Sequence, residues 1–142
     1  MPILRVTKNF EFEAAHALTG YKGKCAHLHG HGYKLSVCVR GEAGTDGMVI
    51  DFKLLKQIVN EQVIDIYDHA LIVSESAIDS FDMRSELFSN VIRCKFVPTS
   101  ENLLIEFAHK ISKSLPEKVE LFSLTLSETQ GNSAQWFAQD NI

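Results

Sequence analysis

Two segments in the first third of the chain alternate between apolar and polar residues, which is the pattern of β-strands with one buried face. In residues 4–16, with Lys8 as the exception, one face carries Leu4, Val6, Phe10, Phe12, Ala14 and His16. In residues 29–41, one face carries His29, His31, Tyr33, Leu35, Val37 and Val39. The sequence therefore predicts two strands, and the glycine-rich residues 41–47 predict a turn after them.

Two later segments have the spacing of amphipathic helices. The first has Asp51 as its expected N-cap, and its periodic positions are Leu54, Leu55, Ile58, Val59 and Gln62. The second begins within residues 98–102, ends before Pro116, and has an apolar stripe made of Leu103, Leu104, Phe107, Ala108 and Ile111. Between the helices, residues 94–97 fit a short strand, whereas residues 74–93 have no clear period and receive no assignment.

The end of the chain returns to the strand pattern. Residues 119–128 predict a strand with one face made of Phe122, Leu124, Leu126 and Glu128. Residues 133–139, which contain Trp136, predict a last strand. The order of two strands, two helices and two strands is typical of an α+β fold. Because the strands of each pair are neighbours in the sequence, we expect antiparallel pairing.

Length and composition restrict the function classes. The chain has 142 residues, of which 45% are hydrophobic and 23% charged, so we expect one globular domain over residues 1–142 and exclude disorder as the main state. No apolar run approaches the roughly 18–20 residues that cross a bilayer, and the start lacks the pattern of a secretory signal. We therefore expect a cytoplasmic protein without a membrane partner. The net charge of −4 argues against a nucleic-acid partner, because phosphate contacts need clustered Lys and Arg.

Histidine provides the strongest chemical signal. His29 and His31 are two positions apart on one predicted strand, so both rings project from the same face, roughly 6.5–7 Å apart. If the first two strands pair antiparallel, His16 comes close to both. Three histidines with an open fourth position are typical of a catalytic zinc site, and the sequence therefore predicts Zn²⁺ as a cofactor.

Other interpretations of these residues stay open. Histidines on an apolar strand face also occur as hydrogen-bonded core residues, and the ligand types alone do not exclude iron or nickel. His27 is out of phase with the other two histidines and is left out of the ligand set. Cys25 precedes His29 by four residues. It is either a base or nucleophile whose thiolate a nearby zinc ion favours, or a fourth ligand that closes the site.

Acidic residues add further candidates. The dipeptide Asp68-His69 fits an acid–base relay in which the carboxylate orients the imidazole, and it also fits a solvated turn. Glu128 ends a predicted strand on its apolar face, where a carboxylate is either paired or accepts N–H groups from a ligand. Glu101 has a simpler explanation as an acidic residue in the first turn of a helix.

Several of these motifs occur together and in the order found in one enzyme superfamily. They are Phe12-Glu13-Ala14-Ala15-His16, Cys25-Ala26-His27-Leu28-His29-Gly30-His31-Gly32-Tyr33, Gly47-Met48-Val49-Ile50-Asp51-Phe52, Asp68-His69, Pro98-Thr99-Ser100-Glu101-Asn102-Leu103 and Glu128-Thr129. On this set the chain resembles the 6-pyruvoyl-tetrahydropterin synthase superfamily over residues 4–137. The Cys-x3-His-Gly-His spacing is similar to that of the bacterial 6-carboxytetrahydropterin synthases of queuosine biosynthesis.

The resemblance implies the tunnelling fold, in which a four-stranded antiparallel sheet carries two helices on one face. It also implies that subunits join edge to edge into a barrel, as a homohexamer built from two trimers with sites at subunit interfaces. The zinc ligands that it implies are His16, His29 and His31. It gives Cys25 the role of general base, with Asp68 and His69 as relay partners. The residues that it implies for pterin binding are Glu128, Glu101, Ser100 and Thr99.

The implied enzyme is a zinc-dependent lyase. It converts 7,8-dihydroneopterin triphosphate to 6-carboxy-5,6,7,8-tetrahydropterin and releases acetaldehyde and triphosphate. The alternative is 6-pyruvoyl-tetrahydropterin synthase, which eliminates triphosphate from the same substrate without cleaving the side chain. A non-catalytic zinc- or pterin-binding protein and a zinc hydrolase on another scaffold are further alternatives. The candidate triphosphate ligands, chosen by proximity in sequence, are Lys22, Lys24 and Lys34.

Overall fold

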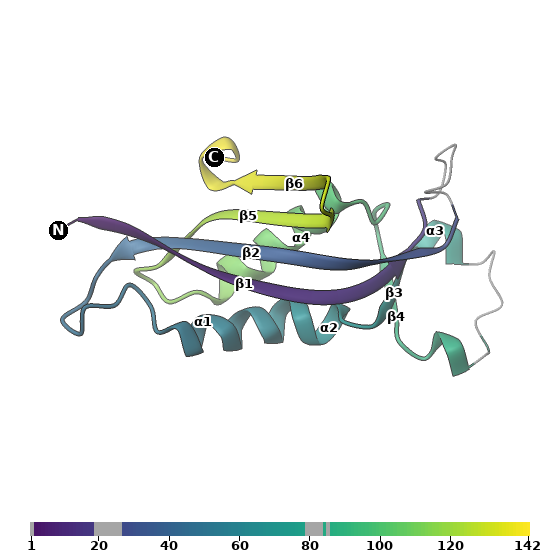
Figure 1. Cartoon of the computed structure of the whole chain (residues 1–142), viewed down its shortest axis with the longest axis horizontal. Helices are drawn as coiled ribbons and strands as arrows, with labels where there is room; N and C mark the ends of the chain where they lie inside the picture. Colours follow the sequence, from purple (N-terminus) through teal and green to yellow (C-terminus); the bar gives the residue numbers. More distant parts are fainter. Residues whose placement is uncertain (1, 19–26, 79–83, 85) are drawn as a thin grey trace.

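The computed structural model describes residues 2–18, 27–78, 84 and 86–142, and these form a curved six-stranded sheet with helices beneath it (Figure 1). Strands β1 (Ile3–His16) and β2 (His29–Glu42) pair antiparallel along their whole length. Helix α1 (Phe52–Val59) follows and continues through a π-helical turn (Asn60–Ile64) into α2 (Asp65–Tyr67). The predicted turn and the first predicted helix therefore occur in the expected order.

The second half of the chain adds the edge strands and a long helix. Its elements are β3 (Ala70–Ser74), α3 (Glu75–Ile78), a 3-10 turn (Glu86–Phe88), β4 (Val91–Cys94), α4 (Ser100–Ser114), β5 (Glu120–Thr129), β6 (Asn132–Phe137) and a final 3-10 turn (Ala138–Asp140). The strand order is β4-β3-β1-β2-β5-β6, and β3 pairs parallel with both β1 and β4. None of the described helices has the length and apolar character needed to span a membrane.

The expectation of a four-stranded antiparallel sheet is wrong, because the described residues form six strands and two of the pairings are parallel. Of the two additional strands, β3 was not predicted at all, because its residues are all buried or half-buried and therefore show no alternation. A short apolar run of this kind has no period that separates a strand from a buried helix. The strand expected at residues 94–97 lies at Val91–Cys94 instead, where it pairs with β3.

One face of the sheet packs against the helices, as expected (Figure 1). Phe12 of β1 stacks on Tyr33 of β2 with ring centroids 4.9 Å apart, and it meets Phe107 of α4 edge-on. The helical residues of the same core include Leu55, Val59, Leu103, Leu104 and Ile111. Leu54, which we expected in the apolar stripe of the first helix, is 39% exposed.

Side-chain caps begin both long helices. Oδ1 of Asp51 accepts a hydrogen bond from the N–H of Lys53 at 2.8 Å, which confirms the predicted N-cap of α1. The hydroxyl of Thr99 accepts a hydrogen bond from the N–H of Asn102 at 3.1 Å and caps α4. The second helix therefore begins within the predicted residues 98–102.

A β-bulge changes the orientation of Phe122, which we expected on the apolar face of its strand. Cys38 pairs with Ser123, but the next residue, Val39, pairs with Leu121, so Phe122 has no partner on β2. Leu121 therefore joins the core, whereas the ring of Phe122 lies 3.8 Å beneath the guanidinium of Arg5. The alternation alone could not reveal this shift, because it assumes a regular strand.

Candidate metal centre and its surroundings

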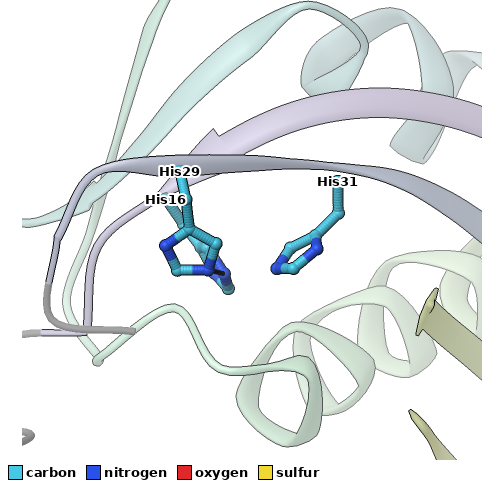
Figure 2. A group of neighbouring side chains, drawn as sticks. All are labelled: His16, His29 and His31. Atoms are coloured by element: carbon cyan, nitrogen blue, oxygen red, sulfur yellow. Dashed lines mark hydrogen bonds between the residues drawn. The ribbon is translucent and has the colours of Figure 1, made fainter. Parts of the chain in front are cut away.

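The β1–β2 register brings three histidines together. His16 pairs with His29, and Ala14 pairs with His31, so the three imidazoles project from the same face of the sheet. Figure 2 shows the rings converging on one point beneath the two strands. Their ligand nitrogens all lie within 4.8 Å of one another, and the Nε2 atoms of His16 and His29 are 3.1 Å apart. The predicted meeting of these three histidines is therefore confirmed.

Backbone carbonyls orient two of the rings. Nδ1 of His16 lies 2.7 Å from the carbonyl oxygen of Pro98, and Nδ1 of His29 lies 2.7 Å from that of His27. Because a carbonyl only accepts hydrogen bonds, each Nδ1 carries the proton, and in the neutral ring Nε2 presents a lone pair. Two lone pairs at 3.1 Å repel each other unless a cation lies between them. Hydrogen bonds from Nδ1 to a backbone carbonyl, as in these two rings, are typical of metal-binding histidines.

His31 completes the donor set. Its Nε2 is buried and has no hydrogen-bond partner among the described residues, and the nearest carboxylate oxygen, Oε2 of Glu128, is 3.8 Å away. A buried polar atom without a partner is rare in folded proteins and is often explained by a ligand or ion. Nitrogens bound to tetrahedral zinc are roughly 3.3–3.4 Å apart, given zinc–nitrogen distances of about 2.0–2.1 Å. The three histidines therefore fit a divalent metal ion.

Burial favours the neutral form of two of these imidazoles, those of His16 and His31. Desolvation lowers the pKa of His16, and the charge of His29 adds to the effect, although the contact with the Pro98 carbonyl opposes it. Desolvation also lowers the pKa of His31, while the charge of Glu128 opposes the shift. A histidine must be neutral at its ligand nitrogen to bind a metal ion, so these shifts favour binding.

Tyr33 was predicted as a strand residue without a role in the site. Its ring is fully buried, and its hydroxyl lies 3.3 Å from Nδ1 of His16. Burial raises the pKa of Tyr33, and the charge of Glu128 adds to this shift, so the hydroxyl stays protonated. Its place in the strand pattern suggested only a core residue. The contact with His16 depends on the fold.

The Asp68-His69 pair immediately precedes β3 and lies next to Glu13 of β1. Oδ1 of Asp68 accepts the N–H of Glu13 at 2.9 Å and lies 3.0 Å from Nδ1 of His69. His69 has a φ of 61°, which is uncommon for a residue other than glycine, and its side chain is 75% exposed. A cavity of about 470 Å³ is lined by both His69 and His31. The backbone of Glu13 therefore holds the pair in place, and His69 alone of the two lines the cavity that His31 also lines.

Glu128 lies at a second β-bulge, between residues of β5 that pair with β6. Its Oε1 accepts a hydrogen bond from the hydroxyl of the buried Ser100 at 2.5 Å. Ser100 opens helix α4, so the carboxylate lies at the positive end of that helix. A small cavity of about 80 Å³ beside this pair is lined by Ser100, Glu101, Glu128, Asn132, Ser133 and Ala134. The β6 residues of this cavity were not among the sequence candidates.

Cys25, Lys22 and Lys24 fall outside the described residues. Thr99 uses its hydroxyl as the cap of α4. His27 contributes a backbone carbonyl, and its side chain is exposed, which agrees with leaving it out of the ligand set.

Comparisons with known proteins cover nearly the whole chain. The family described as 6-pyruvoyl tetrahydropterin synthase matches residues 5–139. A 6-carboxy-5,6,7,8-tetrahydropterin synthase from Haemophilus influenzae is 34% identical over 134 residues, which cover 89% of this chain and 94% of the relative. A protein of the same name from Rickettsia bellii is 32% identical and covers 89% of this chain and 95% of its own length.

Solved structures share the fold. The 6-pyruvoyl tetrahydropterin synthase of Caenorhabditis elegans is 30% identical, has a TM-score of 0.74, and covers 97% of each chain. An uncharacterized protein from Wolinella succinogenes is 21% identical with a TM-score of 0.78, covering 97% of this chain and 99% of its own. At that identity, the second likeness indicates the fold alone.

Proposed function

Because the chain belongs to the 6-pyruvoyl tetrahydropterin synthase family, we propose that it converts 7,8-dihydroneopterin triphosphate and one water molecule to 6-carboxy-5,6,7,8-tetrahydropterin, with release of acetaldehyde and triphosphate. The observation that carries this proposal is the three-histidine cluster beside Glu128. It occurs in a chain whose curated relatives at 32% and 34% identity bear this enzyme name. The proposed enzyme is a lyase that supplies queuosine biosynthesis.

We propose Zn²⁺ as the metal, held by Nε2 of His16, His29 and His31. When bound, zinc supplies Lewis-acid chemistry that polarises the side-chain oxygens of the substrate and acidifies the adjacent C–H bonds. The buried Nε2 of His31, which has no hydrogen-bond partner among the described residues, supports this ligand set. The carbonyls of Pro98 and His27 support it as well, because they keep the protons of the other two rings on Nδ1.

Proton transfer is assigned to Cys25, Asp68 and His69. The thiolate of Cys25 would take a proton from the substrate side chain. His69 would return or relay a proton through Nε2, because its Nδ1 faces Oδ1 of Asp68 at 3.0 Å. General acid–base steps contribute about 10²–10⁴-fold each. A Cys25→Ala variant should therefore lose turnover by that order, and full turnover in this variant would remove the base assignment.

Pterin binding is assigned to Glu128 and its neighbours. A carboxylate accepts hydrogen bonds with both oxygens, which suits the N–H groups of an amino-pyrimidine ring. The hydroxyl of Ser100 donates to Oε1 of Glu128 and sets the orientation of the carboxylate. Glu101 lines the same small cavity and Thr99 caps the adjoining helix, so both are proposed at the edge of this pocket.

Triphosphate binding needs cations, and Lys34 is poorly placed for this role. It lines a hollow of about 230 Å³ together with three carboxylates, those of Glu11, Glu13 and Asp68. These would repel a triphosphate. The proposal therefore rests on Lys22 and Lys24, and charge-removing substitutions of these two residues should raise KM more than the same change at Lys34.

We also propose the homohexamer and its barrel. The edges of the described sheet are β4 and β6, and an open edge strand offers unpaired N–H and C=O groups to another subunit. Native mass spectrometry of the purified protein tests this assembly. A monomer at micromolar concentration would contradict it.

The alternative product is 6-pyruvoyl-tetrahydropterin, which forms without carbon–carbon cleavage. It stays in consideration because the C. elegans enzyme of that name is 30% identical over 97% of this chain. Incubation of the zinc-loaded protein with 7,8-dihydroneopterin triphosphate, followed by mass spectrometry and an acetaldehyde assay, separates the two. Acetaldehyde with the carboxylated pterin supports the proposal. A pyruvoyl product favours the alternative, and an unchanged substrate contradicts both.

A further inference from the structure

We propose that Asn90 is a positioning residue that holds His69 in the orientation required for its contact with Asp68. The catalytic consequence rests on the function proposed above, whereas the positioning itself is argued from contacts within the chain.

His69 needs external support because of its backbone. Its φ of 61° places it in the left-handed region, which few residues other than glycine adopt. Such conformations persist only where the surroundings hold them, and they cluster at functional sites. On the N-terminal side of His69, the support comes from Glu13. Its carbonyl accepts the N–H of His69 at 2.5 Å, and its N–H donates to Oδ1 of Asp68 at 2.9 Å.

On the C-terminal side of His69, the support comes from Asn90. In β3 and β4 the parallel pairing begins with Leu71 opposite Val91, and the N–H of Leu71 donates to the carbonyl of Asn90 at 2.9 Å. In a regular parallel ladder, the backbone N–H at position 90 would donate to the carbonyl of His69. Here the side-chain amide Nδ2 of Asn90 donates to that carbonyl, at 3.3 Å. The side chain thus extends the ladder by one hydrogen bond, to the residue with positive φ.

Two neighbouring peptide groups therefore contact the same residue. The backbone carbonyl of Asn90 accepts from the N–H of Leu71, and its side-chain amide donates to the carbonyl of His69. Both peptide groups that flank Ala70 are therefore bonded to Asn90. Together with Glu13 on the other side, this leaves the backbone of His69 bonded at both its N–H and its carbonyl. The direction of the imidazole depends on this backbone, so loss of the Asn90 amide should loosen the contact between Nδ1 of His69 and Oδ1 of Asp68.

Variants of Asn90 test the proposal because the residue is exposed, so truncation removes the amide without opening the core. Asn90→Ala removes the donor, and Asn90→Gln retains an amide. The matched control is Asn141→Ala, since the amide of Asn141 also donates to a backbone carbonyl, that of Phe137 at 2.8 Å. We expect Asn90→Ala to lower kcat about 10–100-fold with KM unchanged, as small displacements of catalytic groups do. Asn90→Gln should recover part of the loss, and Asn141→Ala should match the parent protein.

Nuclear magnetic resonance of the imidazole nitrogens supplies a readout that does not need turnover. In the parent protein His69 should be protonated mainly at Nδ1, and in Asn90→Ala it should shift toward a mixture of the two tautomers. An unchanged His69 spectrum in Asn90→Ala would overturn the proposal, even if the variant were less stable. If the parent protein does not turn over the pterin, the proposed function fails, while the spectra still decide whether Asn90 positions His69.

Discussion

The Nε2 atoms of His16 and His29 face each other at 3.1 Å across the first pair of strands. Each ring has its other nitrogen turned toward a backbone carbonyl, so neither has a free choice of tautomer. The protein thereby presents two lone pairs to one point. Nε2 of His31, without a hydrogen-bond partner in the part of the chain that the structure describes, lies close to the same point. This arrangement is costly without a cation and favourable with one, which makes it the basis of the predictions on metal binding.

Replacing His31 with alanine should lower zinc affinity by more than about 100-fold. Removing only a group that hydrogen-bonds to a ligand typically lowers metal affinity about 10–100-fold, and this variant removes the ligand itself. Competition with a chromogenic chelator measures the affinity. The matched control is His27→Ala, which keeps the backbone carbonyl that accepts from Nδ1 of His29 and should bind zinc like the parent protein. Equal affinity in both variants would contradict the ligand set.

The metal-free protein should lose stability as the pH falls below the ordinary histidine value of 6.5. Burial lowers the pKa of His16 and of His31 in the folded state, so the unfolded chain binds more protons in the interval below 6.5. The free energy of unfolding should therefore be highest above this pH and should decrease as the pH falls through the lowered pKa values. Urea unfolding from about pH 5 to 8, with a chelator present, measures it.

The control for this pH dependence is His109→Ala, because His109 is exposed on α4. It should reproduce the parent curve, whereas His31→Ala should flatten the curve. A free energy of unfolding that rises on acidification would show that the charge of Glu128 outweighs the burial of these rings.

Ser100→Ala should raise KM for the pterin substrate about tenfold or more, because a hydrogen bond to a charged group contributes about 1.5–3 kcal/mol. The variant leaves the carboxylate of Glu128 without the hydroxyl that orients it. Ser114→Ala is the matched control in the same helix, where the hydroxyl donates to the carbonyl of Lys110 at 3.2 Å. Steady-state kinetics of both variants suffice. The same KM in both would argue that the contact between Ser100 and Glu128 does not bear on substrate binding.

Thr99→Ala should lower the free energy of unfolding by about 1 kcal/mol, since it removes the N-cap of α4. Thr99→Ser keeps a hydroxyl in the capping position and should be close to the parent protein. Denaturation by urea measures the difference. A variant with full stability but a raised KM would instead give Thr99 a direct role in substrate binding.

The strands and helices that the pattern predicted correctly have one feature in common. β1, β2, α1 and α4 each have one face in the core and one toward solvent, so their sequences show the period of the backbone. β3 has no such contrast between its faces, and its neighbour β4 lies a few residues before the position predicted for it. The pattern therefore missed β3 because the residues of this strand are buried on both faces.

The candidate site divides in a similar way. The motif residues His16, His29 and His31 were identified because their side chains carry recognisable chemistry. The contacts that orient them come from the carbonyl of Pro98, 82 positions from His16, and from that of His27. Every residue has a carbonyl, so nothing in the sequence singled out these two.

The sequence by itself determined which side chains share a face, because the direction of a side chain in a strand depends only on its position along the local backbone. That was enough to bring the three histidines to one side of the sheet. Only the tertiary structure decided that β3 and β4 extend the sheet, that a bulge turns Phe122 out of the core, and that His69 has a positive φ. These features depend on hydrogen bonds between distant segments, and backbone groups form such bonds wherever the fold brings them together.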